Sequence, residues 1–166
     1  GDLFQWQIGS LKFEDIAVSV LVSIISKKPG KTKLINHFII NDKILLADLP
    51  GYGYAKLSKF ESKKINILIH DYIENRNNLF KVFLLIDIRH EPIKTDLKFI
   101  EYLSNIRTGF HIIFTKSDKI KKSELAKKSK NYIEKIDSHY LDKKFFISSS
   151  STNNGREEIL NFIISD

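Results

Sequence analysis

The sequence contains no cysteine and no methionine. Without cysteine the chain has neither disulfide bonds nor thiolate metal sites. It also lacks the uncharged apolar run of about 18 residues that a membrane-spanning helix needs. The start, GDLFQWQIGSLKFEDIAV, does not have the basic and then apolar grading of a signal peptide, so we expect a soluble intracellular protein. Because position 1 is not methionine, we also expect that the natural start lies elsewhere.

The chain has an excess of basic residues. Lys and Arg number 27 against 20 for Asp and Glu, which gives a net charge of +7 and a pI near 9.4. Clustered basic residues attract phosphate backbones through the release of counterions, which favours RNA as a partner. The alternative is that the many lysines reflect a biased composition and are simply solvated. The charge alone leaves both interpretations open.

The length of 166 residues and the apolar content of 42% predict one compact domain over residues 1–166. Apolar runs alternate with segments of helical periodicity, and we find no internal repeat. This alternation predicts an α/β domain with a mostly parallel sheet and helices on both faces. We predict helices at about 58–74, 94–104, 121–136 and 155–164. We predict strands at about 12–20, 34–40, 43–49, 81–87, 110–115 and 144–148, of which the second and third form a hairpin.

Polar clusters follow three of these strands: DLPG from Asp48, TKSD from Thr115, and SSS from Ser148. Each alone is an ordinary turn or loop. In parallel sheets, however, ligands bind beyond the carboxyl ends of the strands. Asp48 is placed to hold the water shell of a Mg²⁺ ion, and the Gly51 N–H is placed to reach a γ-phosphate.

The third position of interest at these strand ends is Asp118. Its carboxylate offers two acceptor oxygens to the two adjacent N–H donors of guanine, a pair that adenine lacks. The stem of Lys116 is placed to cover the purine face, and backbone N–H groups near Ser149 to meet the guanine carbonyl oxygen. The alternative is that Lys116 and Asp118 form an ordinary surface ion pair. The three clusters in this order indicate a GTPase.

The tripeptide Gly30-Lys31-Thr32 resembles the end of a phosphate-binding loop, G-x-x-x-x-G-K-[ST]. The first glycine of that motif falls on Ile25, and the residues after Thr32 predict a strand rather than the required helix. The tripeptide is therefore not such a loop, and we set aside an adenine-specific ATPase that would use it as one.

Four segments, P-G-K-T, D-L-P-G-Y-G-Y-A-K, R-H-x-P and T-K-x-D, together resemble the EngB (YihA/YsxC) group of translation-factor-related GTPases, over most of the chain from about Lys28. The resemblance implies a three-layer P-loop GTPase fold, a six-stranded sheet with one antiparallel strand, and GTP or GDP with Mg²⁺ as ligands. It further implies a monomer of the bacterial cytoplasm or an organellar matrix, without a membrane partner. The implied role is assembly of the large ribosomal subunit, through that subunit or its rRNA, with effects on cell division and septation.

By the same resemblance, P-G-K-T belongs to the first switch, and Thr32 would ligate Mg²⁺ in the GTP state. The second switch would be Gly51–Lys56, in which Tyr52 and Tyr54 are packing or partner contacts. Neither switch has a glutamine placed to orient water, so intrinsic hydrolysis is expected to be slow. The implied nucleotide-binding residues are Gly30, Lys31, Thr32, Lys33, Leu34, Asp48, Leu49, Pro50, Gly51, Thr115, Lys116, Ser117, Asp118, Ser148, Ser149 and Ser150.

Two further features have open interpretations. Arg89 and His90 are placed to contact the second switch; alternatively, His90, close to Pro92, is a loop residue bonded to backbone. The lysines from Lys116 to Lys130 are a candidate RNA-facing surface or, alternatively, a solvated helix face.

The sequence departs from the family in one segment. The family carries G-R-S-N-V-G-K-S-S and a helix between the first strand and the first switch, whereas here only residues 19–27 separate the two. A crossover with its helix needs at least about 10 to 12 residues, so the phosphate cradle has no counterpart in this sequence. Either the natural protein has this segment between about 18 and 28, or the protein is a degenerate binding module that contacts RNA or ribosomal protein without hydrolysing GTP. We favour the first, because loss of a core helix would expose the sheet.

Overall fold

The computed structural model describes residues 7–8, 11–12, 20–24, 35–40, 44–49, 58–77, 79–136, 139–140 and 144–165. Its strands are β1 (Gln7–Ile8), β2 (Leu11–Lys12), β3 (Val20–Ile24), β4 (Asn36–Ile40), β5 (Ile44–Asp48), β6 (Lys81–Asp87), β7 (Phe110–Thr115) and β8 (Phe145–Ile147). Its α-helices are α1 (Lys59–Asn75), α2 (Lys94–Asn105), α3 (Lys122–Lys135) and α4 (Arg156–Ile164), and Ser117–Lys119 forms a turn of 3₁₀ helix. All four predicted helices are confirmed.

The main sheet has six strands in the order β4-β5-β3-β6-β7-β8, and β1 pairs with β2 in a separate two-stranded sheet. The predicted hairpin is confirmed, because β4 and β5 pair antiparallel along their whole length. The pairs β6–β7 and β7–β8 are parallel. Since β3 is antiparallel to both β5 and β6, those two strands run in the same direction. Four strands, β5 to β8, therefore end at one edge of the sheet.

The central strand differs from the predicted one in place and direction. We predicted a strand at 12–20; the structure has Lys12 in β2 and begins the central strand at Val20, and residues 13–19 lie outside the described part. Where one antiparallel strand was expected, both β3 and β4 run against the other four strands. A short apolar run has the same side-chain pattern in either direction, and the direction follows from the connections and the pairing partners.

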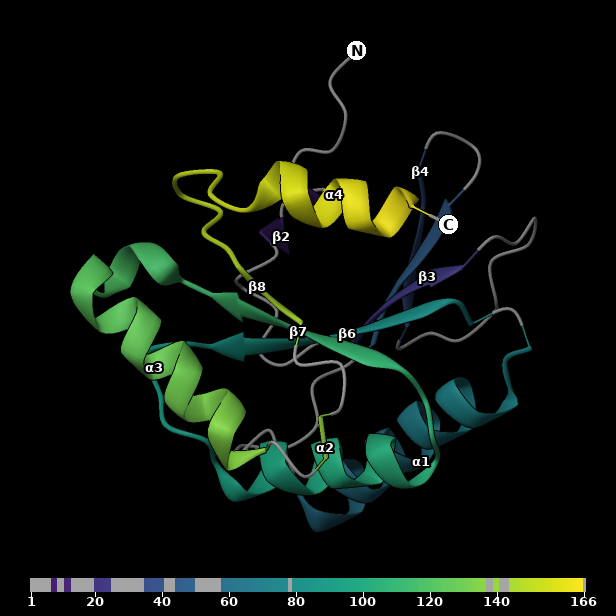
Figure 1. The fold of residues 1–166 in the computed structure, drawn as a ribbon. Coiled ribbons are helices and arrows are strands. Elements are labelled where there is room, and N and C mark those ends of the chain that lie inside the picture. Colours follow the sequence, from purple (N-terminus) through teal and green to yellow (C-terminus); the bar gives the residue numbers. More distant parts are fainter. Residues whose placement is uncertain are drawn as a thin grey trace.

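Helices cover both faces of the sheet, as predicted. In Figure 1, α1, α2 and α3 lie on one side of the sheet and α4 on the other. The first face packs its buried residues with Ile69, Phe99 and Ile133 from the three helices. On the second face, Ile159 and Ile163 of α4 pack against buried side chains of β6, β7 and β8. The two apolar layers enclose β6, of which five consecutive residues are buried.

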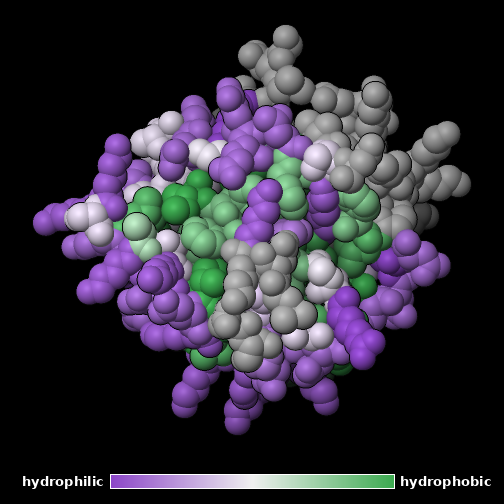
Figure 2. Space-filling view, viewed as in Figure 1, coloured by the Kyte–Doolittle hydropathy of each residue, from purple (hydrophilic) through white to green (hydrophobic). Residues whose placement is uncertain are grey.

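Figure 2 shows hydrophilic side chains around the outline of the described part of this face and apolar side chains toward its middle. Four large apolar side chains of the described residues are exposed: Phe60, Ile67, Phe80 and Ile93. Among the described helices, none is both long enough and apolar enough to span a bilayer.

Candidate functional site

Most of the described candidate residues lie at the edge where β5 to β8 end. Asp48 is the last residue of β5 and Thr115 the last of β7, while Ser148 follows β8. Thr115 is paired with Asp87, the last residue of β6, so the two central strands end level with each other. The predicted residues Gly30, Lys31, Thr32, Lys33, Leu34, Pro50 and Gly51 lie outside the described part.

Asp48 is set back from the other strand ends. Leu21 of β3 pairs with Asp48 on one side and with Phe83 on the other, so Asp48 lies level with Phe83. From Phe83 to Asp87 the strand advances four residues, or about 13 Å at ~3.3 Å per residue. The Asp48 side chain is buried at this position, with 8% of the residue exposed. The strand edge therefore has two parts, one at Asp48 and one at Thr115 and Ser148.

The loop after β7 is held by hydrogen bonds from two neighbouring strand ends and by one bond within the loop. Lys116 adopts a left-handed backbone with φ of 59°, which costs a residue with a side chain about 1 kcal/mol or more. Hydrogen bonds compensate for this conformation: the Ser117 N–H donates to the Ser148 carbonyl over 3.1 Å, and the Lys119 N–H to the Lys116 carbonyl over 3.0 Å. The Ile88 N–H donates to the Thr115 carbonyl over 3.2 Å. The loop thus has one defined shape, built against the ends of β6 and β8.

The carboxylate of Asp118 is oriented by two neighbours. The Ser149 hydroxyl donates to its Oδ1 over 2.7 Å, and the Lys119 ammonium lies 3.2 Å from its Oδ2. The hydrogen bond from Ser149 lowers the pKa of Asp118, outweighing the effect of burial, and Lys119 lowers it further. Asp118 is therefore a fixed anion at neutral pH.

The serine cluster after β8 is packed into the same loop. Ser148 donates from its N–H to the Phe114 carbonyl over 2.7 Å, and Ser149 donates from its N–H to the Asn154 carbonyl over 3.1 Å. Ser148 and Ser149 are both buried, and Ser150 lies in the turn that follows. The Ser149 N–H thus has a partner within the chain. From the sequence we predicted that backbone N–H groups near Ser149 bind the ligand. We did not predict that the Ser149 hydroxyl holds Asp118.

Gly155 closes this loop and begins α4. Its φ is 75°, and a Cβ built on it would lie 2.0 Å from the Ile147 carbonyl oxygen. No side chain fits there, so glycine is required for the backbone of the loop to return over β8. The close contact brings the start of α4 against the strand whose end carries the serine cluster.

Sequence reasoning missed Asp87, which joins the loop to β6. The Lys116 ammonium lies 3.2 Å from Asp87 Oδ2, and the Arg89 guanidinium donates to both carboxylate oxygens, with Nη2 2.6 Å from Oδ2. His90 Nε2 lies 3.8 Å from the same oxygen. Burial alone would raise the pKa of Asp87, but the hydrogen bonds from Arg89 and the neighbouring Lys116 lower it to about 2. The signal in the sequence was the polar group I-D-I-R-H at the strand end, the same kind of signal that identified the other clusters.

The predictions for Arg89 and for the lysine run are refined by these contacts. The second switch lies outside the described residues, so contact with it stays a prediction; the structure shows Arg89 against Asp87. Within the lysine run, Lys128 donates to the Arg89 carbonyl over 2.9 Å. Together with Lys116 and Lys119, it makes contacts inside the chain, which leaves fewer lysines of this run for an external partner.

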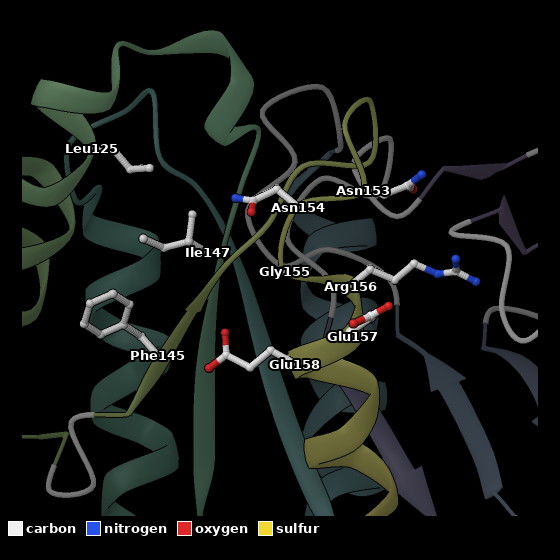
Figure 3. Close-up of a pocket in the computed structure, with 9 residues that line it drawn as sticks. All are labelled: Leu125, Phe145, Ile147, Asn153, Asn154, Gly155, Arg156, Glu157 and Glu158. Carbon is white, nitrogen blue, oxygen red and sulfur yellow. The ribbon is translucent and has the colours of Figure 1, made fainter.

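A groove of about 680 Å³ is lined by residues of α3, β8, the end of the loop after β8 and the start of α4. Figure 3 shows Leu125, Phe145 and Ile147 along one side and the residues from Asn153 to Glu158 along the other. Its lining includes none of the residues predicted from the sequence. The groove is therefore a neighbour of the candidate site and not part of it.

Comparisons with known proteins show which family the chain resembles. A family model described as 50S ribosome-binding GTPase matches residues 13–116. The chain is 43% identical to a probable GTP-binding protein EngB of Porphyromonas gingivalis, over 86% of this chain and 71% of that protein. It is 45% identical to the protein of the same name from Flavobacterium psychrophilum, over 83% and 68%. For Petrotoga mobilis the identity is 40%, over 94% and 79%.

A solved structure shows the same fold. The crystal structure of a probable GTP-binding protein engB superimposes with a TM-score of 0.65, at 24% identity, over 82% of this chain and 81% of that chain. At that identity the likeness concerns the fold alone. It agrees with the predicted P-loop GTPase architecture.

Proposed function

Because the chain belongs to the EngB family of GTP-binding proteins, we propose that the loop after β7 and the serine loop after β8 hold the guanine base of GTP and GDP. One observation carries this proposal: Asp118 is an anion held in one orientation by Ser149, in a loop that itself has one defined shape. An acceptor that is already oriented loses little conformational freedom when it pairs with a donor.

Asp118 selects the base by its two oxygens. Guanine presents an N1–H and an exocyclic amino group side by side, and both can donate to one carboxylate. Adenine presents an acceptor at N1, so its binding would leave the carboxylate without partners at a desolvated interface. Charge-assisted hydrogen bonds are the stronger kind, which makes an ionised Asp118 the main source of selectivity.

The stem of Lys116 covers the purine face in this proposal, and Thr115 and Ser117 shape the loop. Thr115 is buried and donates its hydroxyl to the Ile86 carbonyl over 3.3 Å. Ser117 is buried as well and bonds through its N–H to the serine loop. These two residues act by holding the loop, and the base contacts belong to its exposed atoms.

The phosphate side of the site would lie toward Asp48. An oxygen ligand suits Mg²⁺, which binds proteins through one or two carboxylates and keeps several waters. Asp48, a carboxylate at a strand end, fits that chemistry, and we propose that it acts through water together with the Thr32 hydroxyl. When bound, Mg²⁺ neutralises charge on the phosphates. Gly30 to Leu34, Pro50 and Gly51 would border the phosphates, whereas Leu49 is fully buried in the core and would anchor this segment without touching the ligand.

We further propose that the protein is a slow GTPase that acts in assembly of the large ribosomal subunit, with effects on cell division and septation. The description of the matching family model and the net charge of +7 support a ribosomal partner. Hydrolysis depends on a phosphate cradle, for which this sequence has no counterpart. We therefore propose GTP hydrolysis only for a chain that includes the phosphate-binding segment. A chain that lacks this segment would instead be a binding module on RNA or ribosomal protein.

Titration of the full chain with a fluorescent GDP analogue in Mg²⁺ buffer tests the proposal. We expect saturable binding that unlabelled GDP competes away and ADP does not. The ribosomal part is tested by cosedimentation with large subunits in the presence of GTP or GDP. A folded chain that shows no saturable GDP binding but still sediments with the subunits would establish the binding module instead.

A further inference from the structure

Asp87 is the charged group nearest to the Lys116 ammonium in the described contacts, and its position is set by the sheet. It ends β6, paired in parallel register with Thr115, the residue directly before Lys116. The two strand ends are thus side by side, and the Lys116 ammonium approaches Asp87 Oδ2 to 3.2 Å. Both side chains are largely covered, with 27% of Lys116 and 22% of Asp87 exposed. An ion pair at this burial is stronger than one in open solvent.

The orientation of Asp87 does not depend on Lys116. The Arg89 backbone N–H donates to Asp87 Oδ1 over 3.0 Å, and the Arg89 Nε donates to the same oxygen over 2.9 Å. Arg89 is held in turn by Lys128 of α3, which donates to the Arg89 carbonyl. Asp87 is therefore a carboxylate fixed by its own turn, and it offers Oδ2 to Lys116.

The two ligand-facing residues of the loop have separate supports. Asp118 is held by Ser149 from the β8 side, and Lys116 is held by Asp87 from the β6 side. A lysine side chain otherwise has much rotamer entropy, which is lost when it is ordered against a ligand. Fixing the ammonium before the ligand arrives reduces that loss.

We propose that Asp87 is a positioning residue that holds the Lys116 stem along the plane where a purine ring lies, and so raises the affinity for nucleotide without selecting the base. This inference rests on the proposed function. It assigns affinity to the Asp87–Lys116 pair and base selection to Asp118, and the two contributions are separable by experiment.

The test is a double-mutant cycle of Asp87→Asn and Lys116→Met in the full chain, with the Kd for GDP and for inosine diphosphate measured in each variant. Inosine lacks the exocyclic amino group, so the ratio of the two Kd values reports on Asp118. We expect Asp87→Asn to weaken both ligands by about three- to tenfold and to leave their ratio unchanged. In the Lys116→Met background, Asp87→Asn should change either Kd by less than about twofold.

Glu91→Gln is the matched control. Glu91 lies on the turn that follows Asp87 and forms an exposed ion pair with Lys135 of α3, at 2.8 Å. Removing this pair should leave both Kd values unchanged. If Asp87→Asn does not fold, Asp87→Glu replaces it, since it keeps the charge and displaces it by one methylene group.

Three results would overturn the inference: no effect of Asp87→Asn, an equal effect in the Lys116→Met background, or a ratio that falls toward one. A Kd ratio that falls toward one would mean that the substitution had changed the shape of the whole loop and not only the position of Lys116. If the wild-type chain binds no GDP, the proposed function fails together with the inference. GDP binding without coupling between positions 87 and 116 overturns the inference only.

Discussion

In the proposed function, Asp118 is a carboxylate that is oriented before a ligand binds. A charged group at a protein surface is usually free to turn, and ordering it reduces the gain from each contact. Here the Ser149 hydroxyl donates to Oδ1 of Asp118, and the Lys119 ammonium lies against Oδ2. Each carboxylate oxygen has a further acceptor site, so both oxygens remain available to donors from a ligand.

We predict that Asp118→Asn moves the preference of the site from guanine toward xanthine nucleotides. The amide replaces one acceptor by a donor, which matches the carbonyl oxygen that xanthine has in place of the guanine amino group. Competition titrations with GDP and xanthosine diphosphate measure the change, and we expect the ratio of the two affinities to shift by about tenfold or more. An unchanged GDP preference would remove the role assigned to Asp118.

We predict that the lowered pKa of Asp87 makes the free energy of unfolding depend on pH. Its folded-state pKa, about 2, lies below the ordinary value of 3.8. Because its pKa is lower in the folded state, Asp87 stabilises the fold at pH values above its pKa in the unfolded chain. This contribution is lost as the pH falls from about 4 toward 2. We expect it to amount to about 1 kcal/mol after allowance for solvent screening.

Urea unfolding of the wild type and of Asp87→Asn at pH 5 and at pH 3 measures this contribution. Other carboxyl groups titrate alike in both proteins, so the difference between them isolates Asp87. The wild type should lose more stability on acidification than the variant. Equal losses would show that the ion pairs of Asp87 are not present in solution.

At the scale of elements, α1 shows local sequence deciding local structure. Ser58 precedes the helix, its Oγ accepts from the Glu61 N–H over 3.2 Å, and Glu61 Oε2 accepts from the Ser58 N–H over 2.9 Å. These two bonds form a capping box, in which a serine before the helix is followed three residues later by a glutamate. The box satisfies N–H groups that have no partner within a helix. It also determines where α1 begins after the predicted second switch.

We predict that Ser58→Ala destabilises the protein by about 1 kcal/mol, because the first turn of α1 loses its cap. Urea unfolding monitored by circular dichroism gives the value. Asn66→Ala is the control, since Asn66 is exposed in the middle of the same helix and alanine has the higher helix propensity. A loss in the control equal to that in Ser58→Ala would mean that the cap contributes nothing.

At the scale of the whole molecule, the proposed site lies where the parallel strands β6, β7 and β8 end side by side, with the end of β5 set back from them. The loops after β7 and β8 come from positions more than 30 residues apart, yet Ser149 reaches Asp118 over 2.7 Å. The parallel pairing of β6, β7 and β8 produces this meeting, with α3 and α4 packed on opposite faces. Ligand binding at such an edge should stabilise the fold as a unit.

We therefore predict that GDP raises the melting temperature of the full chain. At about 100 times its Kd, a ligand specific for the folded state stabilises it by about 2.7 kcal/mol. For a chain of this size that corresponds to a rise of about 5 to 10 °C, while ADP at the same concentration should produce almost none. Differential scanning fluorimetry with both nucleotides measures it, and equal shifts for the two would contradict guanine selectivity.

Much of the fold was predictable because its elements are locally specified. Buried strands such as Lys81–Asp87 are continuous apolar runs, and helices such as α1 have a capping box and apolar spacing. Thr115, Lys116, Ser117 and Asp118 were predicted as site residues because three polar clusters follow strands in a particular order and because the motifs resemble a GTPase family; each cluster alone is an ordinary turn. The direction of β3 was not predictable, since it depends on which strands it pairs with.

The amino-acid sequence by itself determined the order of strands and helices, the strand ends that carry polar residues, and the resemblance to a GTPase family, because each depends on neighbours along the chain. Only the tertiary structure decided which polar groups meet. Asp87 holds Lys116 and Ser149 holds Asp118 because parallel strands bring their ends to one edge. Those contacts join residues 29 and 31 positions apart in the chain, and no local pattern of side chains specifies a partner at that distance.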